Sequence, residues 1–268
     1  MLNPDRLTVV LVSPRNPLNI GAAARAMANF GFSNLVVVAP YEPHWREAKS
    51  AVGAEKLLEE ARCTPSLAEA IADCTLVLGT AAPTRRRPEQ PVVSLPDLVP
   101  IVQQEISRGG RVALVFGPEK RGLTRQDLSY CHVLLEIPTD PRQPSMNLAQ
   151  AVAVCLYELS VPRSDPAQTH QPAAATRAPD FVSAPSRQSD LPTDPPATTA
   201  DLHRLALIIE QTMLAANYSP PAMRNANRHH LHLFLRRLAF TRSDCRRVLG
   251  LFRRILWNLE RPASKPKT

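Results

Sequence analysis

The sequence predicts an α/β protein whose parallel sheet is covered by helices on both faces, followed by a small all-α region. Two features of the first 160 residues predict the sheet: five short runs rich in Val and Leu recur along the chain, and helical stretches separate them. A third feature, a proline-rich stretch ahead of a renewed helical pattern, predicts that the C-terminal part is a separate unit.

The elements of the α/β part follow from short apolar runs and from helix caps. We expect strands at 7–13, 34–39, 75–80, 111–117 and 132–138. The intervening helices are one opened by Asn19 and ended by Gly31, a helical stretch through about 44–72, and one capped by Ser94 that runs to about Arg108. A last apolar helix closes this part of the chain after Asn147.

The remainder of the chain divides into a linker and a helical tail. Residues 161–199 contain eight prolines and few large apolar side chains, which predicts a flexible linker. Helical patterns return at 201–218, 222–240 and 241–259, with Thr241 as the expected cap of the last. We therefore expect an α/β domain over 1–160, the linker over 161–199 and a basic helical domain over 200–268.

The excess positive charge of the chain, +8 in all, lies in its C-terminal part. Residues 1–160 hold 16 Lys and Arg against 16 Asp and Glu, whereas residues 201–268 hold 13 against 4. A basic unit beside a neutral one predicts a polyanion-binding appendage. Nucleic acid is the first candidate for the polyanion, and a membrane surface is the competing one.

Composition argues against several other classes of protein. The chain has no uncharged apolar run of about 18 residues and no apolar leader, so we expect a cytoplasmic protein without a membrane partner. Its five cysteines lie far apart and form no C-x-x-C pair, which argues against disulfides and zinc. His229, His230 and His232 have no acid or cysteine among them, so we expect no metal site.

The loops after four of the expected strands are candidates for a binding site, because open parallel sheets bind ligands beyond the carboxyl ends of their strands. They read SPRNPLNIG, GTAAPTRRRPEQP, FGPEKRGLT and IPTDPRQPSMN. In the third loop, Gly117 and Gly122 have the spacing of a phosphate-binding loop, but Leu123 stands where the lysine belongs, which disfavours a nucleotide hydrolase. A tight turn and a ligand loop remain equal interpretations of this loop.

Two further features indicate ligand binding. Arg25 has only Gly, Ala and Asn three and four residues away on its helix, so it is either a plain surface arginine or an anion-binding one. Three prolines stiffen residues 137–147, directly before a helix whose first amides are free near Ser145. We expect Asn147 both to cap that helix, with Gln150 at the third helical position, and to contact the ligand.

Three motifs resemble those of a known family. N-x-G-A-A-A-R at 19–25, F-G-P-E-x-x-G-L at 116–123 and P-S-M-N-L-A-x-A-V at 144–152 are similar to the signature motifs of the SpoU/TrmH branch of the SPOUT RNA methyltransferases, in the same order. The resemblance covers about residues 5–160, and Met146 stands where the family often has leucine. The basic helical tail resembles that of the TrmJ type, which methylates a ribose 2′-oxygen at position 32 of the tRNA anticodon loop, on C or U.

The resemblance implies S-adenosyl-L-methionine as methyl donor, a deep trefoil knot in the α/β domain and a homodimer that completes each active site across its interface. It implies donor contacts, largely through the backbone, at Thr80, Ala81, Ala82, Gly117, Ile137, Pro144, Ser145 and Met146. It also implies that Arg25, Glu119, Ser145 and Asn147 lie near the reaction. Because a guanidinium is not readily deprotonated, we expect Arg25 to clamp the adjacent phosphate and stabilise alkoxide charge while Ser145 orients the hydroxyl.

RNA contacts are expected from arginines, namely Arg85, Arg86, Arg87, Arg228, Arg236 and Arg237. A solvated helix face would explain any single one of them, but nine arginines between Arg224 and Arg254 favour a surface that binds phosphates. One alternative function is 2′-O-methylation of ribosomal RNA. The other is a non-catalytic RNA-binding knot protein, against which the intact Arg25, Glu119, Ser145 and Asn147 argue.

Overall fold

The α/β part of the chain is built on one parallel sheet. The computed structural model describes residues 2–81, 89–161, 194–220 and 223–261. Seven strands pair in the order β3-β2-β1-β6-β4-β7-β5, and every pair is parallel. They are β1 (Leu7–Val12), β2 (Leu35–Val38), β3 (Arg62–Thr64), β4 (Leu76–Thr80), β5 (Val92–Ser94), β6 (Val112–Phe116) and β7 (Val133–Glu136). The predicted parallel α/β fold is therefore confirmed.

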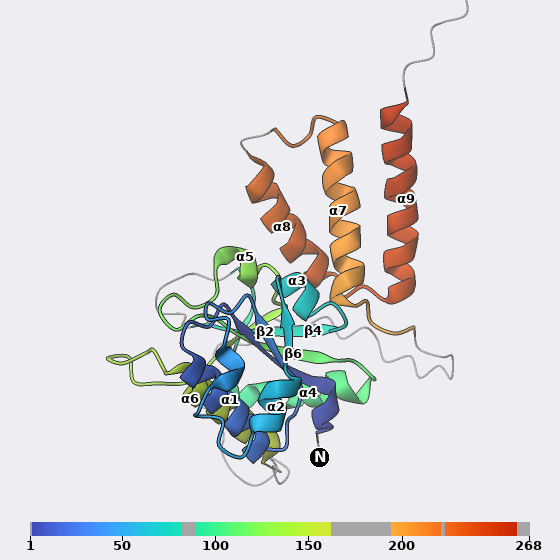
Figure 1. Ribbon diagram of the computed structural model, residues 1–268. Coiled ribbons are helices and arrows are strands. Elements are labelled where there is room, and N and C mark those ends of the chain that lie inside the picture. Colours follow the sequence, from blue (N-terminus) through green and yellow to red (C-terminus); the bar gives the residue numbers. More distant parts are fainter. Residues whose placement is uncertain (1, 82–88, 162–193, 221–222, 262–268) are drawn as a thin grey trace, which may run out of the picture.

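Helices cover both faces of this sheet. One face carries α1 (Pro17–Asn29), α2 (Glu55–Glu60), α4 (Leu95–Ser107) and α6 (Leu148–Ser160), and the other carries α3 (Leu67–Ala70) and α5 (Arg125–Leu128) (Figure 1). Two 3-10 turns, η1 (Pro4–Arg6) and η2 (Trp45–Glu47), complete the elements described in this part.

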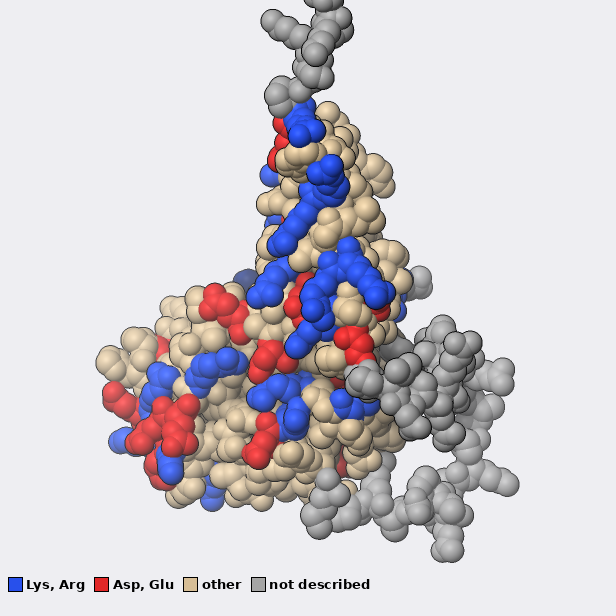
Figure 2. Space-filling model, turned by 90° about the vertical axis from the view of Figure 1, so that its right-hand side faces the viewer, with Lys and Arg blue, Asp and Glu red and all other residues tan. Residues whose placement is uncertain are grey.

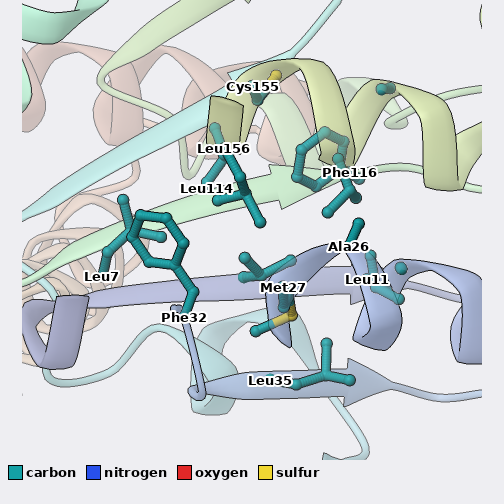
Figure 3. Close-up of a cluster of buried hydrophobic side chains, with 14 of the residues drawn as sticks. Leu7, Leu11, Ala26, Met27, Phe32, Leu35, Leu114, Phe116, Cys155 and Leu156 are labelled. Atoms are coloured by element: carbon teal, nitrogen blue, oxygen red, sulfur yellow. The ribbon is translucent and has the colours of Figure 1, made fainter. Parts of the chain in front are cut away.

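The central strands are buried on both faces, which explains their continuous apolar runs. In β1, Leu7, Val9 and Leu11 pack into the cluster beneath α1 and α6, whereas Val10 and Val12 pack into the cluster beneath α3. Alternate side chains of a strand point to opposite faces, so a strand covered by helices twice has no polar side. Figure 3 shows the larger cluster, in which Phe116 lies among side chains of β1, α1 and α6.

Three local predictions were wrong. Helix α1 begins at Pro17 rather than at Asn19, because the side chain of Asn16 caps it by accepting from the Leu18 amide at 3.0 Å. The expected helical stretch over 44–72 contains only η2, α2 and α3, and strand β3 lies between the last two. Strands β3 and β5 were missed because each has only three residues and lies at an edge of the sheet.

The C-terminal residues form three helices that rise from the α3 side of the sheet (Figure 1). They are α7 (Thr199–Ala215), α8 (Arg224–Arg237) and α9 (Arg242–Glu260). Thr241 and Asp244 make a reciprocal capping box at the start of α9, as expected for Thr241. Most of the predicted linker lies outside the described residues, so the predicted domain division stays a prediction.

The helical tail is joined to the α/β part by defined hydrogen bonds. The amides of Thr199 and Ala200, which have no acceptor inside α7, donate to the carbonyls of Cys74 at 2.8 Å and Ala72 at 2.9 Å. From α8, the Arg236 guanidinium donates to the carbonyl of Tyr130 at 2.9 Å. Within the described parts of the chain, no helix is long and apolar enough to cross a membrane.

Candidate functional site at the carboxyl edge of the sheet

The segments that carry the three motifs meet at the carboxyl edge of the sheet. Strands β1 and β6 are neighbours, β4 follows β6, and β7 follows β4, so the loops after all four strands open on the same edge. Helix α6 begins after the loop that follows β7 and packs beside α1. The three motifs are therefore close in space although the first begins 125 residues before the third in the chain.

A chain of hydrogen bonds joins these three motifs. The side-chain amide of Asn147 donates to Asn19 Oδ1 at 3.1 Å, and the side-chain amide of Asn19 donates to Glu119 Oε1 at 2.8 Å. The carboxylate of Glu119 also accepts from the backbone amides of Arg15 at 3.2 Å and Asn16 at 3.3 Å. One side chain from each motif thus takes part, and the loop before α1 is fixed to the loop after β6.

Glu119 is held as a carboxylate. Its partial burial raises its pKa, but the hydrogen bonds from Asn19 and from the amides of Arg15 and Asn16 outweigh burial and keep the pKa below the usual value. An ionised Glu119 can only accept hydrogen bonds, which fixes the orientation of the Asn19 amide and, through it, that of Asn147. Glu119 therefore organises the site rather than donating a proton.

Asn147 caps α6 and contacts the rest of the site at the same time. Its Oδ1 accepts from the amides of Ala149 at 3.0 Å and Gln150 at 3.4 Å, and its Nδ2 donates to Asn19. The predicted cap is confirmed. The side chain uses its acceptor for the helix and its donor for the neighbouring motif, so both its position and its amide orientation are fixed.

Arg25 is exposed and makes no hydrogen bond or ion pair with another described residue. It lies six residues after Asn19 on α1, about 9 Å further along the helix axis. Gly21, four residues before Arg25, leaves no open space beside the helix, because a Cβ on Gly21 would lie 2.4 Å from Ser50 Oγ. The residues after η2 already pack there, so only the outer side of Arg25 is free.

The proline-containing loop after β7 is closed by its own hydrogen bonds. Arg142 pairs with Asp140 in a bidentate geometry, at 3.0 and 2.7 Å, and Thr139 Oγ1 donates to the Pro144 carbonyl at 3.5 Å. Ser145 is exposed, and its hydroxyl has no partner among the described residues. Ile137 and Met146 instead pack, partly buried, against the main core. The loop thus presents one polar and two apolar side chains next to the cap of α6.

The remaining residues predicted to hold the donor have structural roles of their own. Thr80 Oγ1 donates to the Val115 carbonyl at 3.1 Å, and the Ala81 amide donates to the Leu135 carbonyl at 3.0 Å, so β4, β6 and β7 stay in register to their ends. A Cβ on Gly117 would lie 2.3 Å from the backbone of residues 122 and 123, so glycine is required there for the loop to close. Ala82 lies outside the described residues.

The third loop is therefore a tight turn, which supports one of its two interpretations. Leu123 is buried in the core cluster beneath α3 and occupies the position where a phosphate-binding loop would need its lysine. Gly122 adopts a φ of 63°, and its amide donates to the Pro118 carbonyl at 2.9 Å. The turn also carries Glu119. Within this loop, Gly122 and Leu123 thus have structural roles, whereas Glu119 belongs to the candidate site.

The predicted arginines of the tail differ in their surroundings. Arg236 is only 8% exposed and contacts Tyr130 and His232, so its assignment to an RNA surface is wrong for this conformation. Arg228 is half-exposed and forms a bidentate pair with Glu210, and Arg237 is exposed. Arg85, Arg86 and Arg87 lie outside the described residues. Lys and Arg side chains nevertheless follow the length of the helical projection (Figure 2).

Thiols and histidines form no metal site in the described part of the chain. All five cysteines are free, and burial raises the pKa of Cys74, Cys131 and Cys155 to about 12, so these thiols are unreactive. His229 and His230 face Glu89 at 3.2 and 3.5 Å and thereby join α8 to the residues before β5.

Asn19 and Asn16 were not among the predicted site residues, although both belong to the first loop. Asn19 appeared to be a helix cap, whereas it lies in the first turn of α1 and donates to Glu119. An available signal was the position of Asn16 directly before Pro17, which is the usual order of a cap and a first helical residue. If the cap had been assigned to Asn16, the side chain of Asn19 would not have been needed as a cap and could have been predicted as a site residue.

Comparison with known proteins gives consistent results. Residues 6–157 match the SpoU rRNA Methylase family. The chain is 44% identical over 156 residues to the tRNA (cytidine/uridine/adenosine-2′-O-)-methyltransferase TrmJ of Pseudomonas aeruginosa, a match that covers 58% of this chain and 60% of that protein. The chain thus spans about three fifths of the length of that relative.

Two further similarities extend into the tail. The tRNA (cytidine/uridine-2′-O-)-methyltransferase TrmJ of Pectobacterium atrosepticum is 33% identical over 219 residues, covering 81% of this chain and 83% of that protein. The crystal structure of TrmJ from Z. mobilis ZM4 superposes with a TM-score of 0.74 at 28% identity, covering 95% of this chain and 99% of that one. By its motifs, its fold and these matches, the chain belongs to the SpoU rRNA methylase family.

Proposed function

We propose that the chain is an S-adenosylmethionine-dependent 2′-O-ribose methyltransferase that acts on tRNA, at C or U in position 32 of the anticodon loop. The observation that carries the proposal is the hydrogen-bonded chain Asn147–Asn19–Glu119, which brings all three motifs of the family to one edge of the sheet. The Pseudomonas and Pectobacterium relatives are both named tRNA 2′-O-methyltransferases, which supports tRNA and the ribose oxygen.

The residues at this edge fit the methyl donor. Ile137 and Met146 offer partly buried apolar surface for a planar ring, and the exposed hydroxyl of Ser145 lies two residues before the α6 cap, Asn147. The prolines stiffen the loop, so its backbone groups are fixed before a ligand arrives. When bound, S-adenosylmethionine supplies a methyl group on a positively charged sulfur.

The chain's own residues position the hydroxyl that receives this methyl group. Ser145 orients the 2′-hydroxyl, and Arg25, which has no internal ion pair, clamps the adjacent phosphate and stabilises negative charge as it develops on the oxygen. Asn19 and Glu119 act by keeping the α6 cap and the loop after β6 in place. Because methyl transfer is a displacement between two reactants, much of the rate enhancement comes from this positioning.

A homodimer is part of the proposal. Helices α1 and α6, which carry the first and third motifs, expose the large apolar side chains of Leu18, Val154 and Tyr157. Exposed apolar surface of this kind is typical of protein interfaces. Arg25 also makes no contact with Asn19, Glu119 or Asn147 of its own chain, as expected if a second copy completes each site. The deep knot rests on the family resemblance and the cytoplasmic location on composition, and both stay predictions.

Ribosomal RNA is the second candidate substrate, because the matching family is named for rRNA methylation. A methyl-transfer assay with purified full-length chain separates the two. We expect transfer to a tRNA with C or U at position 32, and none to the same tRNA with 2′-deoxyribose there or to ribosomal RNA fragments. Transfer to the deoxy tRNA would contradict the proposed nucleotide, and transfer to ribosomal RNA alone would contradict the proposed substrate.

Donor binding is tested separately by calorimetry with S-adenosylhomocysteine and with ATP. We expect only the first to bind, because Leu123 replaces the lysine that ATP phosphates would need. Binding of ATP alone would contradict a methyltransferase.

A further inference from the structure

A cationic cavity lies beside the hydrogen-bonded cluster, and Asn19, Glu119 and Asn147 are not in its lining. It has a volume of about 400 Å³ and opens between the loop after β1 and the loop after β6, with Ser13, Arg15, Lys120, Arg121, Gly122 and Asp127 in its lining. Cavities that bind nucleotide-sized ligands have volumes of roughly 300–1,000 Å³. The cavity is thus large enough for a single nucleotide unit.

The charge of this cavity is not neutralised from within the described chain. Lys120 and Arg121 are exposed and make no ion pair with a described residue. The one acid in the lining, Asp127, uses Oδ2 to accept from the amide of Thr124 at 2.9 Å and from its hydroxyl at 2.7 Å. Glu119, the other acid of the loop, is bound to Asn19 and to the amides before α1. The lining thus holds three cations, Arg15, Lys120 and Arg121, against the single carboxylate of Asp127, so an anion would meet a net positive charge.

The walls of the cavity are fixed. Ser13 has a φ of 45°, an uncommon backbone conformation for a residue other than glycine, and its amide donates to the Val38 carbonyl at 2.7 Å. Such conformations persist where the surrounding structure enforces them, and they concentrate at functional sites. On the opposite wall, the amides of Arg121 and Gly122 donate to the Pro118 carbonyl. The cationic side chains thus extend from two turns that need no rearrangement.

An exposed aromatic ring lies next to the cavity. Tyr41 is 70% exposed, and its amide donates to the Pro14 carbonyl at 3.2 Å, which fixes it to the loop that carries Arg15. The Arg15 guanidinium lies over one side of the Tyr41 ring, 5.6 Å from its centroid. Phosphate-binding cations beside a free aromatic ring are the combination by which proteins hold unpaired nucleotides.

We infer that this cavity binds a phosphate of single-stranded RNA, with Lys120 and Arg121 on the phosphate and the neighbouring base stacked on Tyr41. The inference rests on the proposed function for the source of the RNA and extends it, since Lys120 and Arg121 stand at the two unspecified positions of the second motif. Through the bonds of Glu119 to the Arg15 and Asn16 amides, the cavity is rigidly connected to the cluster. It would hold the strand next to the nucleotide that reacts.

The test is RNA binding by the full-length chain, measured by fluorescence anisotropy over a range of salt concentrations. The two ligands are a tRNA and a single-stranded oligoribonucleotide. Lys120→Ala/Arg121→Ala should weaken binding and lower the slope of log K against log salt by about 1, since both cations contact the same phosphate. Lys49→Ala/Lys56→Ala removes the same charge from exposed positions around α2 and should leave the slope unchanged. Equal slopes for the two double variants would overturn the inference.

Tyr41 gives an independent measurement. Tyr41→Ala should weaken RNA binding roughly 10-fold without changing the salt slope, and Tyr41→Phe should restore it, because stacking needs the ring and not the hydroxyl. A loss that Phe does not restore would overturn the stacking contact.

Two controls separate this inference from the proposed function. The Lys120/Arg121 variant should bind S-adenosylhomocysteine as the unchanged chain does, and weaker binding would overturn the inference by assigning the cavity to the donor. Methyl transfer is measured on the same samples. If RNA binding depends on Lys120 and Arg121 but no methyl transfer occurs, the proposed function is contradicted and the RNA site in the cavity is supported. If methyl transfer occurs and all variants bind RNA equally well, only the RNA site in the cavity is contradicted.

Discussion

The α/β part and the helical tail bury their apolar side chains to very different degrees. Strands β1 and β6 are almost fully buried, and two core clusters cover both faces of the sheet. The tail has one small cluster, α9 buries only Cys245, and large side chains remain exposed on all three helices, among them Leu207, Phe234, Leu251 and Trp257. The sheet can therefore hold a site rigidly, whereas the tail provides surface and charge for a partner.

The largest expected effect is on the core of the sheet. Phe116 is 1% exposed, and Phe116→Ala should lower the free energy of unfolding by about 3 to 5 kcal/mol, because it removes a ring and leaves a cavity. Phe234, on α8, is 51% exposed, and Phe234→Ala should change stability by less than about 1 kcal/mol. Urea unfolding curves measure both, and similar losses would contradict the contrast between the two regions.

The next effect concerns Arg25. Arg25→Lys should lower kcat/KM for tRNA by about 100-fold, because an ammonium cannot replace the planar fork that grips a phosphate in two places. Arg108→Lys, at an exposed position after α4, is the matched control and should leave the rate unchanged. Near-normal turnover of Arg25→Lys would contradict the clamp.

A smaller effect is expected where the two regions meet. Arg236 is buried without a carboxylate and donates across the junction to the carbonyl of Tyr130, so Arg236→Ala removes this bond and should destabilise the protein by about 1 to 3 kcal/mol. Arg237→Ala, one residue further on and exposed, should cost less than about 0.5 kcal/mol. If thermal unfolding shows equal losses for the two variants, Arg236 does not hold the tail to the sheet.

A pH dependence at the same junction gives a measurement of a different kind. Burial, together with the positive charge of Arg236, lowers the pKa of His232 to about 3. An unfolded histidine takes up a proton near pH 6.5, so stability is complete above that value and falls as the pH decreases toward 3, by about 1.4 kcal/mol per pH unit. His232→Gln should make this decrease shallower, while His132, whose pKa is also about 3, preserves part of it.

The matched control for that change is His44→Gln, since the side chain of His44, directly before η2, is 81% exposed. Its unfolding free energy should follow the same pH curve as that of the unchanged chain. A His232→Gln curve parallel to that of the unchanged chain between pH 6.5 and 4 would contradict a neutral, buried His232.

The central strands could be predicted because a strand that is buried on both faces has an uninterrupted run of apolar residues in the sequence. The edge strands could not, since β3 reads Arg-Cys-Thr and exposes two of its three residues. The helical stretch expected over 44–72 was misjudged because its Ala, Glu and Leu favour helix, while Gly53, with a φ of 75°, interrupts it. The turn at Gly53 therefore outweighed the helix propensity of the residues around it.

The site was predictable in part for a related reason. Glu119 and Asn147 lie in motifs next to strand and helix ends, so sequence alone placed them at the sheet edge. The role of Asn19 depends on a partner 100 residues away, and the burial of Arg236 depends on Tyr130, 106 residues away. The sequence shows Arg236 and Arg237 as equivalent, and only the packing of α8 against the α/β part distinguishes them.

The separate roles of the α/β part and the helical tail are tested most directly by steady-state kinetics of methyl transfer to tRNA. The constants kcat and KM are measured for one variant in the α/β part and one in the tail. Glu119→Gln weakens the cluster that joins the three motifs, and we predict a kcat at least about 10-fold lower with little change in KM. Arg237→Ala/Arg253→Ala removes two exposed cations of the tail, and we predict a raised KM with kcat preserved. If both variants changed kcat and KM in the same way, the sheet edge and the tail would not have the separate roles assigned to them.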